Sequence, residues 1–128
     1  MPTLAMEARQ KAFEKQGIKG MFTDLDIKVN CVNEFITILD KAIEDARDML
    51  IERFNWICSQ DASSAKFMYE NNVMRGYHPE QGIRSALQHG TIVIGQLGLA
   101  ETLQILIGCD HTEPRGMELA KRVEALFK

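Results

Sequence analysis

A glycine-containing turn between two apolar runs has the residue types that best suit ligand binding. Gly95-Gln96-Leu97-Gly98 separates the run at residues 91–94 from an apolar run that begins at Leu99. Free N–H groups at a helix N-terminus attract anions, so such a turn is able to hold a phosphate group. It lacks, however, the GxGxxG spacing of dinucleotide sites and the Lys-Ser/Thr pair of a P-loop. Either a phosphate turn or a plain packing turn fits the pattern.

Glu101 stands in the first turn of the helix expected after Gly98. The helix dipole favours a carboxylate at that position, which accounts for the residue without any catalytic role. An acid or positioning group of an active site is the second interpretation. No Ser-His-Asp arrangement or carboxylate pair accompanies it, so we predict no catalytic residue in this chain.

Cys109, Asp110, His111 and Glu113 crowd one turn and have side chains that bind metals. Four ligands from five consecutive residues would strain a tetrahedral site, and no second cluster completes it. The remaining thiols, Cys31 and Cys58, are far from Cys109 in sequence and form no CxxC pair. We therefore predict reduced cysteines, no disulfide framework and no metal site.

The composition is that of one ordinary globular domain. The 128 residues are 45% hydrophobic and 26% charged, with a formal net charge of −3. Nucleic acids and anionic membranes are bound through clustered positive charge, and the sequence has no basic stripe. We therefore expect neither partner. No apolar run is long enough for a membrane span, and the charged N-terminal stretch is unlike a signal peptide. The predicted location is cytoplasmic.

Helices dominate the elements expected around the turn. The apolar spacing predicts a first helix over residues 3–16, with Leu4, Ala8, Ala12 and Phe13 on one side and Gly17 as its stop. Residues 25–29 alternate as an edge strand or an extended connection would. The strongest periodicity predicts a long helix over residues 33–60, capped by Asn33.

The second half of the chain is expected to be more varied. Residues 61–77 have no clear period and predict an irregular connection anchored by Phe67, Met68 and Tyr69. A short helix is expected over residues 79–87. Residues 91–94 are apolar on both faces, as in a strand covered on both sides, and a helix follows over residues 99–107. The last helix begins after Thr112 as N-cap and reaches Lys128 without a C-cap glycine, a pattern typical of a cut chain.

The stretch HGTIVIGQLGLAETLQILIG resembles the hGTxxIGxxGLAExxxxLxG segment of the anaerobic, class III ribonucleoside-triphosphate reductases. These are glycyl-radical enzymes that make deoxyribonucleotides. FITILDKAIEDARDMLIERF and HTEPRGMELAKRVEALF resemble the helices that flank the segment in the family. The resemblance covers residues 30–128, is most specific over residues 90–101, and is loose over residues 1–29.

The resemblance implies a fold that is predominantly α with one short buried strand, as a fragment of a ten-stranded α/β glycyl-radical barrel. Residues 91–95 would form one barrel strand, with the helices outside it. In the parent enzyme the end of that strand would approach the ribonucleoside triphosphate, which makes Gly95, Gly98 and Glu101 the candidate substrate-proximal residues. The whole chain, residues 1–128, would be a single domain from the catalytic barrel of a longer enzyme.

Several parts of the family pattern have no counterpart here. The sequence has no ATP-cone domain, finger-loop cysteine, C-terminal zinc site or RVxGY-like radical glycine; in Arg75-Gly76-Tyr77 the arginine directly precedes the glycine. The glycyl radical and the structural zinc are thus implied only for the full-length parent, and no cofactor is expected in this chain. Radical chemistry cannot run without both radical partners, so we expect the isolated chain to be inactive.

Three functions are compatible with these patterns. The first is a fragment of an anaerobic ribonucleotide reductase. The second is a stand-alone helical interaction module whose long helix dimerises through its apolar stripe. The third is a small phosphate- or nucleotide-binding protein that uses residues 95–101. Self-association through exposed apolar helix faces is expected under the first two readings.

Overall fold

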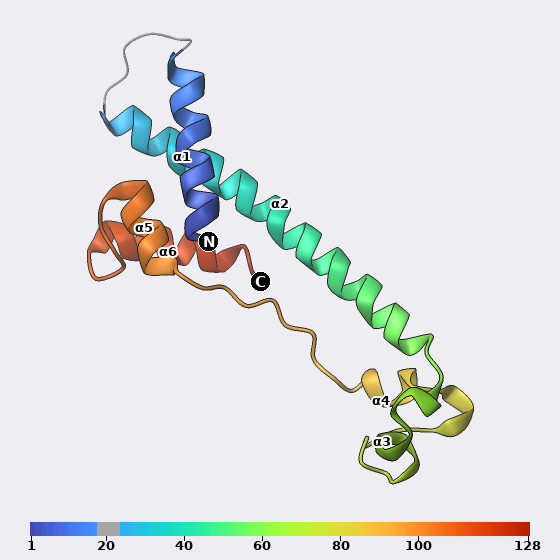
Figure 1. Ribbon diagram of the computed structural model, residues 1–128. Coiled ribbons are helices and arrows are strands. Elements are labelled where there is room, and N and C mark those ends of the chain that lie inside the picture. The colour runs from blue at the N-terminus through green and yellow to red at the C-terminus, as the bar shows by residue number, and fades with distance from the viewer. Residues whose placement is uncertain (18–23) are drawn as a thin grey trace. The chain divides into compact units, whose positions relative to one another are not determined.

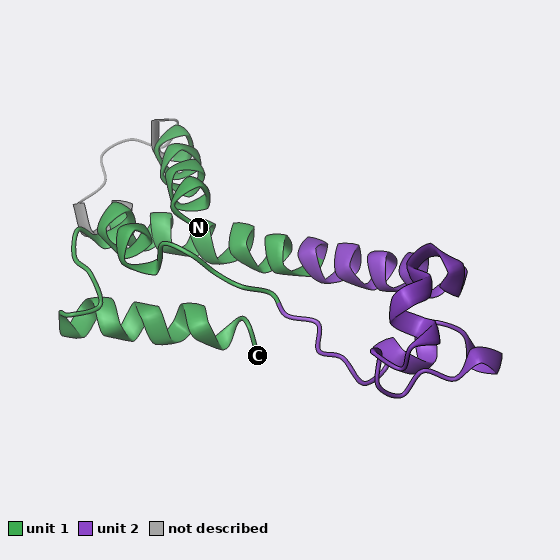
Figure 2. Cartoon of the chain, turned by 60° about the horizontal axis from the view of Figure 1, so that its bottom comes forward, with its two compact units in different colours: residues 1–44, 94–128 green, residues 45–93 purple. Residues whose placement is uncertain are grey.

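Helices make up most of the protein, whose computed structural model describes residues 1–17 and 24–128, with side chains for residues 1–15 and 28–128 (Figure 1). In chain order the elements are α1 Pro2–Gly17, α2 Asp24–Cys58, the 3₁₀ turn η1 Ala62–Ala65, α3 Lys66–Glu70, the 3₁₀ turn η2 Pro79–Gln81, α4 Arg84–Leu87, α5 Leu99–Ile107 and α6 Pro114–Ala125. The predominantly helical fold is therefore confirmed. The described residues divide into two compact units, residues 1–44 with 94–128, and residues 45–93 (Figure 2).

Unit 1 is built around a small-residue face of α1. Ala5, Ala8 and Ala12 are three and four residues apart and are almost fully buried, because side chains at that spacing share one helix face. α1 packs against α5, and α5 against α6. The core shared by these helices and the first part of α2 consists of Ala5, Ala8, Ala12, Cys31, Val32, Phe35, Leu39, Leu103, Leu106, Leu119, Ala120 and Val123.

The first helix agrees with the expectation, but its apolar face is turned slightly from the predicted one. Leu4 is half-buried, and Phe13 is 46% exposed under the guanidinium of Arg9, which lies 5.7 Å from the ring centroid. The buried face consists of Ala5, Ala8 and Ala12, and Phe13 lies outside it. The ring of Phe13 lies at the edge of the interface between α1 and α5. The three small alanine side chains permit a close approach of these two helices.

α2 begins at Asp24, so the expected edge strand over residues 25–29 is wrong, and so is Asn33 as N-cap. Thr37 Oγ1 donates a hydrogen bond to the Asn33 carbonyl, as happens in a helix interior. The alternation misled because helical spacing continues upstream: Cys31 and Phe35 are four apart and both are buried. Residues 18–23 of the same expected connection lie outside the described residues.

Unit 2 has a small core beneath short helices and turns. Tyr69, Ile83 and Ala86 are its buried cluster, and the rings of Tyr69 and Tyr77 lie 4.9 Å apart. Of the three anchors expected in residues 61–77, only Tyr69 is buried, while Phe67 is 72% exposed. The stretch contains η1 and α3 and is less irregular than expected. The short helix expected over residues 79–87 is present as η2 and α4, interrupted at Gly82.

A buried serine joins the two ends of the turn that precedes α4. Ser85 Oγ accepts a hydrogen bond from His78 N at 2.8 Å and donates one to the Gly82 carbonyl at 2.7 Å. Ser85 is 1% exposed, so these bonds are made away from water, where an unpaired polar group would be costly. Unit 2 therefore has polar contacts as well as an apolar cluster in its interior.

The buried strand expected at residues 91–95 is wrong for this structure. Residues 91–98 run as an extended segment without helix or strand, and the described residues contain no strand that would pair with it. Val93 is 73% exposed and Leu97 is 86% exposed. A strand is defined by hydrogen bonds to a neighbouring strand, and none is present to supply them. The β-branched composition of residues 91–94 alone was not enough to form a strand.

The last two helices lie close to their expected positions. α5 spans Leu99–Ile107, as predicted, between Gly98 and Gly108, which both have positive φ angles. α6 begins at Pro114 after Glu113, so Thr112 is not its N-cap. Gly116 is buried in its first turn, where a Cβ would lie 1.7 Å from the carbonyl oxygen of Asp110. Only glycine permits this approach of α6 to the preceding loop.

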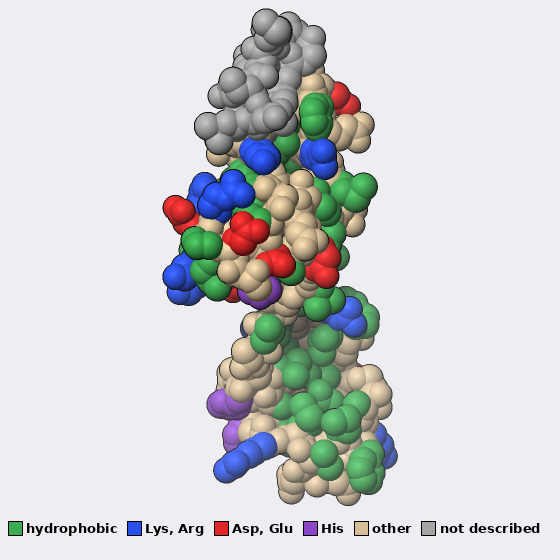
Figure 3. All heavy atoms as spheres, turned by 90° about the vertical axis from the view of Figure 1, so that its left-hand side faces the viewer, with side chains coloured by type: hydrophobic (Ala, Val, Ile, Leu, Met, Phe, Trp, Pro, Cys, Tyr) green, Lys and Arg blue, Asp and Glu red, His purple; other side chains and the backbone are tan. Residues whose placement is uncertain are grey.

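Apolar side chains are also left at the surface. Figure 3 shows them gathered over its lower part, which is unit 2; Met49, Trp56 and Phe67 are each more than 60% exposed. Such exposed patches mark interaction surfaces in soluble proteins.

Among the described helices, none is both long enough and apolar enough to span a membrane.

Candidate functional site

The expected phosphate turn is a junction between α1 and α5. Gly98 has a left-handed backbone, with φ at 78°, and a Cβ there would lie 2.7 Å from Cγ of Pro2. The Gly98 carbonyl accepts hydrogen bonds from Thr102 N at 3.0 Å and from Thr102 Oγ1 at 2.7 Å. Thr102 is fully buried, so its hydroxyl fixes the first turn of α5. Both the conformation and the packing thus require glycine at residue 98.

Gly95 and Glu101 differ from Gly98 in their surroundings. Nothing lies within 4 Å of a Cβ placed on Gly95, so packing does not require glycine there. Glu101 is exposed in the first turn of α5, and its Oε2 lies 3.6 Å from the position of a Gly98 Cβ. The three candidate residues thus lie at one end of α5, with a carboxylate beside the turn.

Gln96 ties the same segment to α6. Its Nε2 donates a hydrogen bond to Glu124 Oε1, while its Oε1 is buried with no hydrogen-bond partner among the described residues. The sequence pattern did not single out this residue. The contact shows that the extended segment is held on unit 1 at its C-terminal end.

The crowded residues after Gly108 form a turn. Asp110 Oδ1 accepts hydrogen bonds from Thr112 N at 2.8 Å and from Thr112 Oγ1, and these bonds lower the pKa of the Asp110 carboxyl. Cys109 is buried, and Arg115 Nη2 lies 4.0 Å from its Sγ. In the part of the chain that is described, no three His, Cys, Asp or Glu side chains are grouped to hold a metal ion.

The three cysteines are free thiols, as expected, and they lie apart. Burial raises the pKa of the Cys31 thiol, and the nearby Arg9 guanidinium opposes this only partly. A thiol with a raised pKa is a weak nucleophile, because the thiolate is the reactive form. Cys31 therefore serves the core of unit 1.

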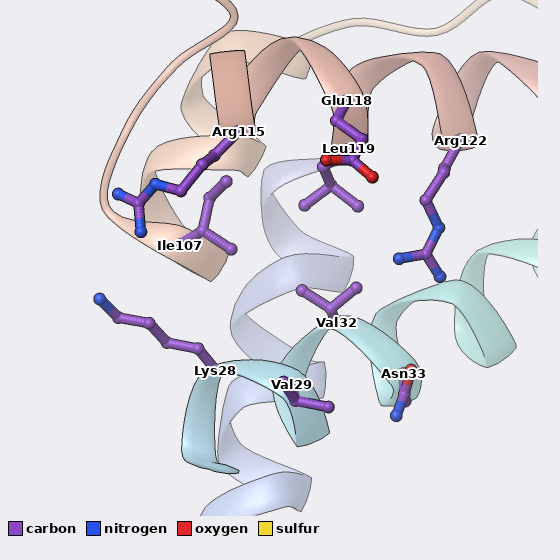
Figure 4. A pocket seen from close by; sticks show the side chains of 9 residues that line it. All are labelled: Lys28, Val29, Val32, Asn33, Ile107, Arg115, Glu118, Leu119 and Arg122. Carbon is purple, nitrogen blue, oxygen red and sulfur yellow. The ribbon is translucent and has the colours of Figure 1, made fainter. Parts of the chain in front are cut away.

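A groove in unit 1 is a site that the sequence pattern did not reveal. It encloses about 250 Å³ between the start of α2, the end of α5 and α6 (Figure 4). Val32, Ile107 and Leu119 provide apolar walls, while Lys28, Arg115 and Arg122 bring three positive charges to it. These residues come from separate elements with no shared motif. A helical wheel of α6 is the one sequence signal that relates Arg115, Leu119 and Arg122, since they are four and three residues apart.

The fold and the expected site define a predominantly helical protein in which the glycine turn joins two packed helices. Comparison with known protein families gives the more particular result: the model of the anaerobic ribonucleoside-triphosphate reductase family matches residues 1–126, and the chain belongs to that family. The match includes α1, which the resemblance reached only loosely. No curated protein and no solved structure matched the chain.

Proposed function

We propose that the chain acts as a helical packing segment of an anaerobic ribonucleoside-triphosphate reductase and does not reduce nucleotides by itself. In this role the residues around the GLAE block hold α5 in place, and Gly95, Gly98 and Glu101 approach the nucleotide only in a complete catalytic barrel. The glycyl radical and the structural zinc belong to that complete enzyme. The family match over residues 1–126 supports the assignment to the enzyme.

The observation that carries the packing role is the contact of Gly98 with Pro2. The first residue of the GLAE block has the left-handed conformation that starts α5, and it lies against the first turn of α1. A side chain at residue 98 would displace the Pro2 ring. Gly98, one of the most family-specific residues, is thus accounted for by the packing of two helices.

Glu101 argues against the alternative of a phosphate site in the isolated chain. A phosphate at the start of α5 would meet the free N–H groups of the first helical turn. It would also meet the Glu101 carboxylate, which lies beside the same turn. Repulsion between two anions a few ångströms apart offsets the attraction of the helix dipole.

Two measurements on the purified chain test the proposal. Anaerobic incubation with ribonucleoside triphosphates and a chemical reductant should produce no deoxyribonucleotide, whereas product formation would refute the lack of activity. Equilibrium dialysis with labelled ATP should show no saturable binding at residues 95–101. Saturable binding that increases in Glu101→Gln would favour the nucleotide-binding alternative. Glu52→Gln is the matched control, because Glu52 is an exposed carboxylate on α2 outside residues 95–101.

A further inference from the structure

The groove between α2, α5 and α6 has more cationic than anionic groups among the described side chains that line it. Lys28, Arg115 and Arg122 line it, and none of them is in an ion pair with a carboxylate of the described residues. Arg115 instead points a guanidinium nitrogen toward Cys109 Sγ. One carboxylate, that of Glu118, lines the same groove. Among the described side chains that line the groove, three cations and one anion surround an apolar floor.

The charges lie at both ends of the groove. Figure 4 shows the charged groups of Lys28 and Arg115 at one end and the Arg122 guanidinium at the other, with Val32, Leu119 and the Glu118 carboxylate between them. A ligand that matches this pattern has an apolar centre with an anionic group on each side. A nucleotide does not match, because its phosphates are all at one end.

The size of the groove also argues against a nucleotide as its ligand. Pockets for drug-sized ligands usually enclose about 300–1,000 Å³, and this one encloses about 250 Å³. It accommodates one apolar side chain more readily than a base, a ribose and a triphosphate together. The Glu118 carboxylate accepts a hydrogen bond from a peptide N–H.

We propose that this groove binds a short protein segment in which an apolar side chain is flanked by carboxylates. The apolar side chain packs on Val32, Ile107 and Leu119. One flanking carboxylate pairs with Lys28 and Arg115, and the other pairs with Arg122. Opposite charges at both ends fix the register of the segment, and the buried side chain supplies most of the affinity. The inference rests on the groove alone and is independent of the reductase activity.

Fluorescence anisotropy with labelled peptides tests the proposal on the full chain. The probes carry one leucine flanked by two glutamates, with one, two or three serines as spacers. We expect saturable binding of at least one peptide, weakened tenfold or more by Arg122→Ala. Lys121→Ala is the matched control, because Lys121 is the neighbouring exposed cation on α6 and does not line the groove. Its binding should equal that of the unchanged chain.

Two further probes separate this occupant from others. Replacing the leucine by serine should abolish binding, and Arg122→Glu should recover affinity for a peptide with lysine at one flank. The recovery also shows that the variant is folded. The proposal is overturned if no spacer length gives saturable binding, or if the serine peptide binds equally well. It is also overturned if ATP binds with the same dependence on Arg122, since the site would then be one for nucleotides.

Discussion

The two units of this protein are stabilised in different ways. Unit 1 buries a continuous apolar layer that joins α1, α2, α5 and α6, with Phe35 and Leu103 fully buried. Unit 2 buries Tyr69, Ile83 and Ala86, and it relies on the hydrogen bonds of Ser85 to close its main turn. Apolar burial contributes about 25 cal/mol per Å², so the smaller cluster contributes less stability. We therefore expect unit 2 to open before unit 1.

The two units also differ in how many large apolar side chains they expose at their surfaces. Phe67 and Trp56 in unit 2 are 72% and 63% exposed, although both are large and apolar. A region with a small core and an apolar surface gains stability when another surface covers it. Unit 1 leaves Leu97 and Met6 exposed as well, but more of its apolar side chains are packed in its own core, so it has less to gain.

The largest expected effect comes from deleting core side chains in each unit. Phe35→Ala should cost about 3–5 kcal/mol of unfolding free energy, because it removes a fully buried ring and leaves a cavity. Hydrogen exchange should then accelerate throughout α1, α5 and α6. Ile83→Ala should accelerate exchange within residues 45–93 and leave α5 and α6 protected. Equal acceleration in both units after Ile83→Ala would contradict their independent stability.

A smaller effect is expected from a single methyl group on α6. Gly116→Ala should destabilise unit 1 by about 3 kcal/mol, because the new Cβ would lie 1.7 Å from the Asp110 carbonyl oxygen. Alanine has the higher helix propensity by about 1 kcal/mol, so the sign of the change shows which effect dominates. Urea unfolding followed by circular dichroism measures it.

Gly95→Ala is the control for this substitution. Its Cβ meets nothing within 4 Å, so its effect should stay within about 0.5 kcal/mol. A neutral Gly116→Ala variant would mean that α6 shifts away from the Asp110 loop at little cost. The core of unit 1 would then be more adaptable than its packing indicates.

The smallest expected effect is in the titration of two aspartates, one in each unit. Hydrogen bonds from Ser63 lower the pKa of Asp61, and hydrogen bonds from Thr112 lower the pKa of Asp110. A depressed folded-state pKa stabilises the protein above the unfolded value of about 3.9 and loses this effect as pH falls through the folded value. Both turns should therefore weaken only below about pH 4.

Carboxyl chemical shifts measured by NMR across this range check the prediction. Thr112→Val and Ser63→Ala should each raise the pKa of the aspartate that loses a donor. An ordinary pKa for Asp61 beside a lowered one for Asp110 would show that the η1 turn of unit 2 is open in solution. That result would sharpen the contrast between the units.

The periodic parts of the fold were predictable from sequence. Residues 99–107 carry apolar side chains at helical spacing between two glycines, and α5 has those bounds. Residues 91–94 were not predictable in the same way, because their β-branched side chains favour a strand but a strand also requires a partner. Asp24 as the start of α2 was missed because the alternation favours a strand, and a stretch of only five residues is too short to exclude a helix.

The candidate residues were found by sequence, but their surroundings were not. Gly98 was recognisable as the start of a helix, whereas its contact with Pro2 depends on tertiary packing. Lys28, Arg115 and Arg122 share one groove although they come from two helices distant in sequence. Composition cannot show which charges of a mildly acidic chain gather on one surface.

The contact between Pro2 and Gly98 also sets an order in time. A ribosome adds about 5–20 residues per second, so roughly 5–20 s separate the synthesis of residue 2 from that of residue 98. During that interval the alanine face of α1 has no α5 to cover it. The interface between α1 and α5 therefore forms only after the GLAE block has been made.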